Sequence, residues 1–240
     1  MCTQHGFSLI ELMIGLALSA VVSLGMYNTF VQQQRVATRQ EHITEVNQTV
    51  RLSMDAMLTE LRGAGFDPDG IASAGILEAD GLHVRFTRDL NCNGSIAQSS
   101  AATPNLGVLD RNDEDVAYTV DPQRQELQRT VFPNGGPGIP QPVASNIVAG
   151  GFCYFLAADL TTCVANPARP FSDIRMVQIT LTARASAPDP QYINRKVPAN
   201  SPFRHYHQAT LTSLLSMRNL GVQRGPVRTL VAFNDPCPLR

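Results

Sequence analysis

An apolar run near the start of the chain constrains the fold more than any other feature of the sequence. Between Phe7 and Val31 the only charged residue is Glu11, and the run contains no proline. A run of about 25 such residues is long enough to cross a bilayer as a helix. It is too long for the apolar part of an ordinary secretory signal peptide, and no Ala-x-Ala site follows it. Residues 7–31 are therefore predicted to form a transmembrane helix.

After Val31 the apolar residues are confined to one stripe. They recur at spacings of three, four or seven, at Val36, Ile43, Val46, Val50, Met54, Met57 and Leu61. This spacing is typical of a helix that rests one face on a globular domain. Two glycines and Pro68 then interrupt the pattern, so the helix is expected to end near Arg62. We expect residues 32–63 to continue the first helix as an amphipathic segment that runs into a head domain.

The head, residues 64–240, has the pattern of a β-rich domain. Asp121, Pro122 and Gln123 separate two apolar runs and predict a hairpin turn, and residues 133–142 and 187–202 are expected to be turn-rich loops. The fold class that follows is α+β, with a long N-terminal helix packed on an antiparallel β-sheet. The predicted strands are Leu82–Thr87, Val116–Val120, Glu126–Val131, Ile147–Ala157, Ile174–Ala183 and Tyr206–Met217.

Charge and motifs argue against nucleic-acid binding and catalysis. The formal net charge is −1, without the basic excess of a nucleic-acid-binding protein. The sequence has no Gly-x-Ser-x-Gly, phosphate-binding loop, dinucleotide fingerprint or His-Glu-x-x-His. His83, His205 and His207 could together hold a metal, but isolated surface histidines are the commoner situation. The chain is therefore not expected to be an enzyme.

The residues at the start of the apolar run carry a specific motif. From Gly6 the sequence reads Gly-Phe-Ser-Leu-Ile-Glu-Leu-Met-Ile-Gly-Leu. It resembles the prepilin cleavage and methylation motif of the type IV pilin family, although its leader lacks the usual Lys or Arg. The resemblance implies the type IV pilin fold. It also implies that prepilin peptidase removes the leader, residues 1–6, by cutting between Gly6 and Phe7, and that the new amino terminus is methylated.

Glu11 is an expensive residue for an apolar helix. A carboxylate there costs roughly 3 kcal/mol or more on insertion scales, so it needs a partner. The amino terminus that cleavage creates in a neighbouring subunit is such a partner, which gives Glu11 a predicted role in assembly. The alternative is that Glu11 only reaches the membrane interface.

A ridge of small residues follows Glu11 along the apolar run. Gly15, Ser19 and Ser23 recur every four residues. Small residues at this spacing let two helices pack closely in lipid or in a filament core. The sequence therefore predicts a helix-packing role for the three residues.

Four stretches of the head resemble a subgroup of the family. Residues 58–68, 115–121, 174–181 and 216–220 are similar to the minor pilins called PilW and to the related J-type pseudopilins. The resemblance implies a minor pilin that helps initiate or cap a type IV pilus and assembles through its N-terminal helix. Its partners would be other pilins, prepilin peptidase and the inner membrane, with the head in the periplasm before assembly.

Two other functions stay open on the sequence. The first is a pseudopilin of a type II secretion piston, which would carry the same N-terminal motif. The second, more distant, is a membrane-tethered periplasmic enzyme that uses the motif only for export.

Cysteine usage predicts disulfides in an exported head. Cys2 lies in the leader, and its removal leaves four cysteines, enough for two disulfides. Cys153 and Cys163 flank a segment that can turn back on itself, so they are the expected pair. Cys92 with Cys237 then follows by elimination.

One polar loop is a candidate calcium site. Asp89, Asn91 and Asn93, followed by Gly94, have the spacing of the first half of an EF-hand loop. Because calcium takes six to eight oxygen ligands, other acids must complete the site, and Asp113 and Glu114 belong to the nearest acidic cluster. The alternative is an ordinary Asn-Gly turn between strands. Calcium is the one cofactor that the sequence suggests.

Overall fold

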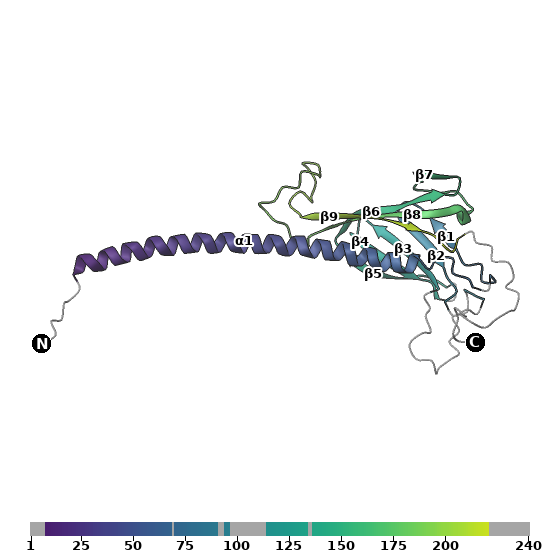
Figure 1. Cartoon of the computed structure of the whole chain (residues 1–240), viewed down its shortest axis with the longest axis horizontal. Coiled ribbons are helices and arrows are strands. Elements are labelled where there is room, and N and C mark those ends of the chain that lie inside the picture. Colours follow the sequence, from purple (N-terminus) through teal and green to yellow (C-terminus); the bar gives the residue numbers. More distant parts are fainter. Residues whose placement is uncertain (1–7, 69, 91–93, 97–113, 134–135, 221–240) are drawn as a thin grey trace, which may run out of the picture.

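The longest element of the molecule is a single N-terminal helix. The structure is a computed structural model that describes residues 8–68, 70–90, 94–96, 114–133 and 136–220. Helix α1 spans Leu9–Leu61, and its first half projects away from a β-rich head (Figure 1). It ends at Leu61, close to the expected end near Arg62, which is the C-cap, and Gly65 then adopts a φ of 75°, which favours glycine.

The head consists of two antiparallel sheets. In the first, the strands lie in the order β1 (Ile76–Ala79), β2 (His83–Thr87), β3 (Asp115–Asp121), β4 (Glu126–Val131) and β5 (Ile139–Ser145). In the second, the order is β7 (Asp159–Val164), β6 (Ile147–Leu156), β8 (Ile174–Arg184) and β9 (Gln208–Ser216). A short 3-10 helix, η2 (Phe171–Asp173), precedes β8. Strand β6 contacts β2, β3 and β4 and so joins the two sheets.

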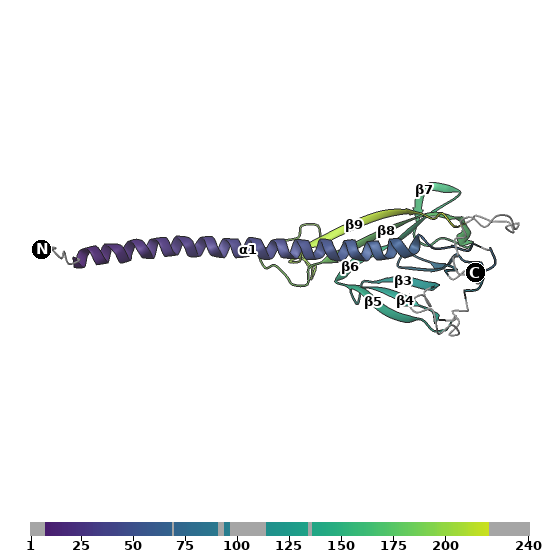
Figure 2. The same ribbon diagram turned by 60° about the horizontal axis from the view of Figure 1, so that its bottom comes forward.

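The second half of α1 packs on the head and completes its core. It contacts β8 and β9 of one sheet and β5 of the other (Figure 2). Each buried apolar side chain stabilises this docking by about 2 kcal/mol, on the order of 10 kcal/mol for five. Val36 and Ile43 of the predicted stripe are exposed, and the buried part of the stripe begins at Val46. The buried residues of α1 are Val46, Val50, Ser53, Met54, Met57 and Leu61.

These observations confirm the expected α+β architecture of a long helix on antiparallel strands. All six predicted strands are present, with ends shifted by no more than two residues. The predicted hairpin joins β3 to β4, and Asp121 Oδ1 accepts hydrogen bonds from the backbone N–H groups of Gln123 and Arg124 at 2.9 and 3.0 Å.

Three short strands, β1, β5 and β7, were not expected from the sequence. The interpretation of residues 133–142 as a loop is wrong for residues 139–142, which begin β5. This strand lies at the edge of its sheet, where proline is tolerated. Pro140 and Pro142 are two residues apart, so their nitrogens face the same side of the strand and β4 can still pair with the other residues.

The connection between β8 and β9, residues 185–207, is the longest connection that the structure describes in full. It reaches back along α1 toward the projecting half of the helix (Figures 1 and 2). Ser186 donates a backbone hydrogen bond to Glu45 Oε1 at 3.3 Å, which ties the connection to α1. The head therefore has a loop at the end that faces the exposed part of the helix.

Candidate functional site: the exposed helix and its anchor in the head

The projecting half of α1 has an apolar surface all round. Its large apolar side chains, from Leu9 to Phe30, are exposed by 54 to 76%. By length and composition this helix could cross a membrane, and none of its most apolar stretch is buried against the head. Such a surface needs lipid or other helices around it.

Glu11 lies in the first turn of α1 and is the only acidic residue there. A carboxylate at this end is favoured by the helix dipole, and it is exposed for contact with another molecule. Gly6 and Phe7, the predicted cleavage and methylation residues, lie outside the described residues. The role of Glu11 in assembly therefore stays a prediction.

The ridge of small residues lies open on the helix. A side chain added at Gly15 would contact nothing, and Ser19 Oγ donates to the backbone oxygen of Leu16 at 2.9 Å. The Ser19 hydroxyl is thus satisfied within its own helix and does not oppose contact with an apolar partner. Ser23 is also exposed. Helix packing through Gly15, Ser19 and Ser23 stays a prediction.

A cluster of polar and charged side chains around Glu60, the Glu60 cluster, links the other end of α1 to the first sheet. Both carboxylate oxygens of Glu60 accept hydrogen bonds from Arg129 of β4 at 2.9 Å. The Tyr118 hydroxyl of β3 donates to Glu60 Oε2 at 2.9 Å, and Arg88 approaches Glu60 Oε1 at 3.4 Å. Burial raises the pKa of Glu60, but the hydrogen bonds and charges of Arg129 and Arg88 outweigh it and hold the pKa below its usual range. Burial is the main reason that the pKa of the Tyr118 hydroxyl is raised, and the Glu60 carboxylate beside it raises the pKa further.

Sequence reasoning missed this cluster. Glu60 follows the helix pattern of an ordinary polar position, and Arg129 is 69 residues away along the chain. The signal in the sequence was that Glu60 follows Met57, a member of the apolar stripe, by three residues and so lies next to it on the helix surface.

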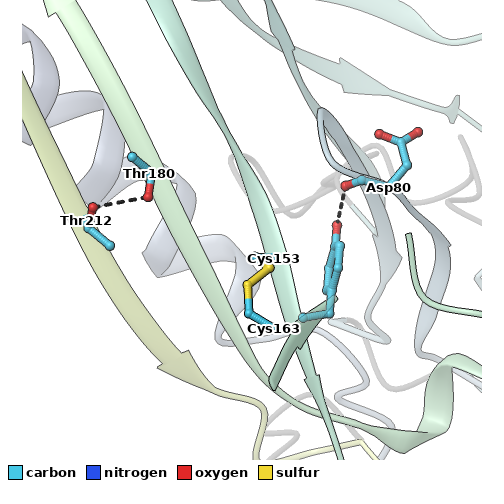
Figure 3. Close-up of a disulfide and its surroundings, with 6 residues drawn as sticks. Asp80, Cys153, Cys163, Thr180 and Thr212 are labelled. Carbon is cyan, nitrogen blue, oxygen red and sulfur yellow. Dashed lines mark hydrogen bonds between the residues drawn. A yellow bond between two sulfur atoms is a disulfide. The ribbon is translucent and has the colours of Figure 1, made fainter. Parts of the chain in front are cut away.

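The predicted disulfide between Cys153 and Cys163 is present. It links β6 to β7 across ten residues, with the two Cα atoms 5.6 Å apart (Figure 3). This separation is within the usual range for disulfides. The other predicted pair, Cys92 with Cys237, lies outside the described residues. On the neighbouring strands, the Thr180 and Thr212 hydroxyls share a hydrogen bond of 3.1 Å, which pairs β8 with β9 (Figure 3).

Removing the disulfide is expected to destabilise the head. In the loop-entropy model, a bridge across a loop of this length stabilises a fold by about 2–3 kcal/mol. Changing both Cys153 and Cys163 to serine should lower the free energy of unfolding by that amount, measured by urea denaturation of the full chain in detergent. Reductant should lower the stability of the wild type by more than that of the variant, because the variant has already lost the Cys153–Cys163 bridge and keeps at most the predicted Cys92–Cys237 pair. A variant as stable as the oxidised wild type would contradict the expectation.

The structure places two members of the candidate calcium site, Asp89 and Glu114, close together, and each accepts a hydrogen bond from the backbone. Asp89 is buried, and its Oδ2 accepts a hydrogen bond from the Gly94 backbone N–H at 3.0 Å. Glu114 is buried too, and its Oε1 accepts from the Leu90 backbone N–H at 3.0 Å. Asn91, Asn93 and Asp113 lie outside the described residues. Calcium stays a prediction here, which elemental analysis of the purified chain would test.

The three histidines considered as metal ligands are not brought together. His83 lies on β2, where its Nδ1 is 2.8 Å from Thr119 Oγ1. His205 and His207 lie in the β8–β9 connection, next to the backbone oxygen of Tyr192 and to Asp189 respectively. Within the described ranges no group of three His, Cys, Asp or Glu side chains is placed to hold a metal.

Comparisons with known proteins agree with the N-terminal motif. Residues 1–27 match the model of the prokaryotic N-terminal methylation motif. No curated protein matches the sequence significantly. Solved structures that resemble the chain include a type IV-like pilin from Thermus thermophilus, at 14% identity and a TM-score of 0.45, covering 73% of this chain and 97% of the pilin. The chain therefore combines an N-terminal methylation motif with an exposed apolar helix and a β-rich head, as a type IV pilin-like subunit does.

Proposed function

We propose that this chain is a minor pilin subunit that helps initiate or cap a type IV pilus and assembles through its N-terminal helix. The observation that carries the proposal is the coincidence of the methylation motif in residues 1–27 with a helix whose apolar side chains are all exposed from Leu9 to Phe30. A protein that needed only an anchor would not need Glu11 inside that helix. A helix that packs beside neighbouring subunits supplies both an apolar environment and an amine partner for Glu11.

In this role the chain is first processed in the membrane and then assembled into a filament. Prepilin peptidase cuts between Gly6 and Phe7 while α1 spans the inner membrane and the head lies in the periplasm. The helix then leaves the lipid and packs among the helices of other pilins, where Glu11 pairs with an amino terminus. The Glu60 cluster and the buried half of α1 keep the head attached to the helix during this transfer.

A pseudopilin of a type II secretion piston is the second candidate, because such a protein would carry the same motif and helix. Deleting the gene and scoring surface pili and secreted proteins separately distinguishes the candidates. If the chain is a minor pilin, cells that lack the gene are expected to have few or no pili and normal secretion. Loss of secretion with normal pili would favour the pseudopilin, and no change in either would favour a tethered enzyme. Restoration by the wild-type gene, but not by a copy with Gly6 replaced by a bulky residue, controls for processing.

A further inference from the structure

A basic cleft lies where α1 leaves the head. It has a volume of about 600 Å³, and one wall is a single face of the helix that includes Val31, Arg35, Arg39 and His42. These positions are three or four residues apart or multiples of that, so they lie on one face. The other wall is the start of the β8–β9 connection, at 188–191.

The charges in this cleft are predominantly positive. Arg39 lies 5.9 Å from the centre of the Tyr192 ring. Among the described residues, Asp189 is the only acid that lines the cleft, and it accepts hydrogen bonds from His207 at 3.2 Å and from the Gln191 backbone N–H at 3.0 Å. Within the described part of the chain, no carboxylate pairs with Arg35.

The connection that forms the second wall is basic as well. From residue 185 to residue 207 its only acid is Asp189, whereas it carries Arg195, Lys196 and Arg204. Arg195 and Lys196 are exposed, and so is the apolar side chain of Ile193, by 51%. A basic loop with an exposed apolar residue is typical of a surface that meets an anionic membrane.

The end of the cleft nearer the apolar run lies at the level of the lipid headgroups. If the apolar run ends at the membrane surface, Arg35 lies about 6 Å and Arg39 about 12 Å beyond Val31, at a rise of 1.5 Å per residue. The headgroup layer is roughly 5–7 Å thick. Helical side chains lean toward the N-terminus, which is the membrane end here, so both guanidinium groups are displaced toward that layer.

We propose that this cleft binds the phosphate headgroup of an anionic phospholipid in the outer leaflet of the inner membrane. Arg35 and Arg39 bind the phosphate, because guanidinium groups match phosphate oxygens in geometry and charge. Val31, at the mouth of the cleft, contacts the first acyl carbons. The bound lipid holds the head upright on the membrane before assembly and must be released when the subunit enters a filament. This inference rests on the proposed membrane-anchored function.

The lipid also accounts for two arginines that are placed against the usual topology rule. Basic residues next to a transmembrane helix normally lie on the cytoplasmic side, whereas the head of a pilin lies on the opposite side. Anionic headgroups in the cleft neutralise Arg35 and Arg39 there.

Native mass spectrometry of the full chain tests the proposal. The detergent-solubilised protein is equilibrated with equal amounts of phosphatidylglycerol and phosphatidylcholine, and the retained lipids are counted. We expect an excess of retained phosphatidylglycerol, reduced about fivefold by Arg35→Gln and again by Arg39→Gln, the factor for one basic residue near an anionic surface. Arg124→Gln, at an exposed position in the β3–β4 turn, should leave the excess unchanged. Excess inorganic phosphate should not displace the lipid, whereas displacement would indicate a site for free phosphate.

Separate outcomes overturn the cleft and the anchor. The chain is first floated with phosphatidylcholine vesicles, and a chain that fails to float would overturn the membrane-anchored function. A chain that floats but retains both lipids equally would overturn only the lipid site. The lipid site is also overturned if Arg124→Gln lowers the excess as much as Arg35→Gln. If neither arginine affects lipid retention but both affect filament incorporation, the cleft instead binds a neighbouring subunit.

Discussion

Glu11→Ala is expected to leave the protein in the membrane and to remove it from filaments. Without the carboxylate, insertion becomes easier by roughly 3 kcal/mol, because no charge has to enter the bilayer. Assembly loses an ion pair that is worth about 4 kcal/mol at 4 Å and an effective dielectric constant of 20. The amount of the subunit in sheared filaments should therefore fall at least about tenfold, measured by immunoblot against the membrane fraction.

Thr29→Ala is the matched control for Glu11→Ala. Thr29 is exposed on the same helix, and its hydroxyl donates to the Gly25 backbone oxygen of that helix, at 3.0 Å. The control should assemble at the wild-type level. Wild-type incorporation of Glu11→Ala, with normal membrane levels, would show that the carboxylate has no partner in the filament.

The second large effect is expected at the anchor of the helix in the head. Glu60→Gln keeps the shape of the side chain but removes the charge that Arg129 and Arg88 share. Breaking one partner of a buried ion pair typically costs 3–5 kcal/mol, and because this pair is only partly buried we expect the lower end, about 3 kcal/mol. Denaturant unfolding of the full chain in detergent would measure the loss. Glu78→Gln is the control, because the Glu78 side chain is 51% exposed beside Arg85 and its ion pair should contribute less than about 1 kcal/mol.

The same cluster predicts how stability depends on pH. The folded-state pKa of Glu60 lies below its ordinary value. Its contribution is therefore complete above the unfolded pKa, about 4.3, and is lost as the pH falls through the folded pKa. The wild type should lose more stability than Glu60→Gln when the pH drops below about 4. Parallel curves for the two proteins would contradict the assignment of Glu60 as the anchor.

The helix and most strands were predictable because their patterns are local. An uninterrupted apolar run, a stripe of apolar residues and two glycines are enough to predict one helix over residues 7–63, and α1 spans Leu9–Leu61. Alternating runs such as Ile174–Arg184 predict buried strands by the same reasoning, because one face must be apolar. The Cys153–Cys163 bridge was also predictable, since the two cysteines lie ten residues apart on either side of a turn.

The features that sequence reasoning missed depend on contacts between distant residues. Strand β5 forms by pairing with β4 at the edge of the sheet, and its two prolines make the sequence read as a loop. Glu60 becomes an anchor only because folding brings Arg129 to it from another element. The cleft beside Arg35 and Arg39 requires the β8–β9 connection to return along the helix, which no local pattern indicates.

The most direct test of the account is the amino terminus of the chain in purified filaments. Sheared pili are collected from cells with the wild-type gene, and the subunit is identified by mass spectrometry. The account predicts that the chain is present at low abundance and begins at Phe7 with a methylated amine. A chain that is absent from the filaments, or one that still begins at Met1, would contradict it.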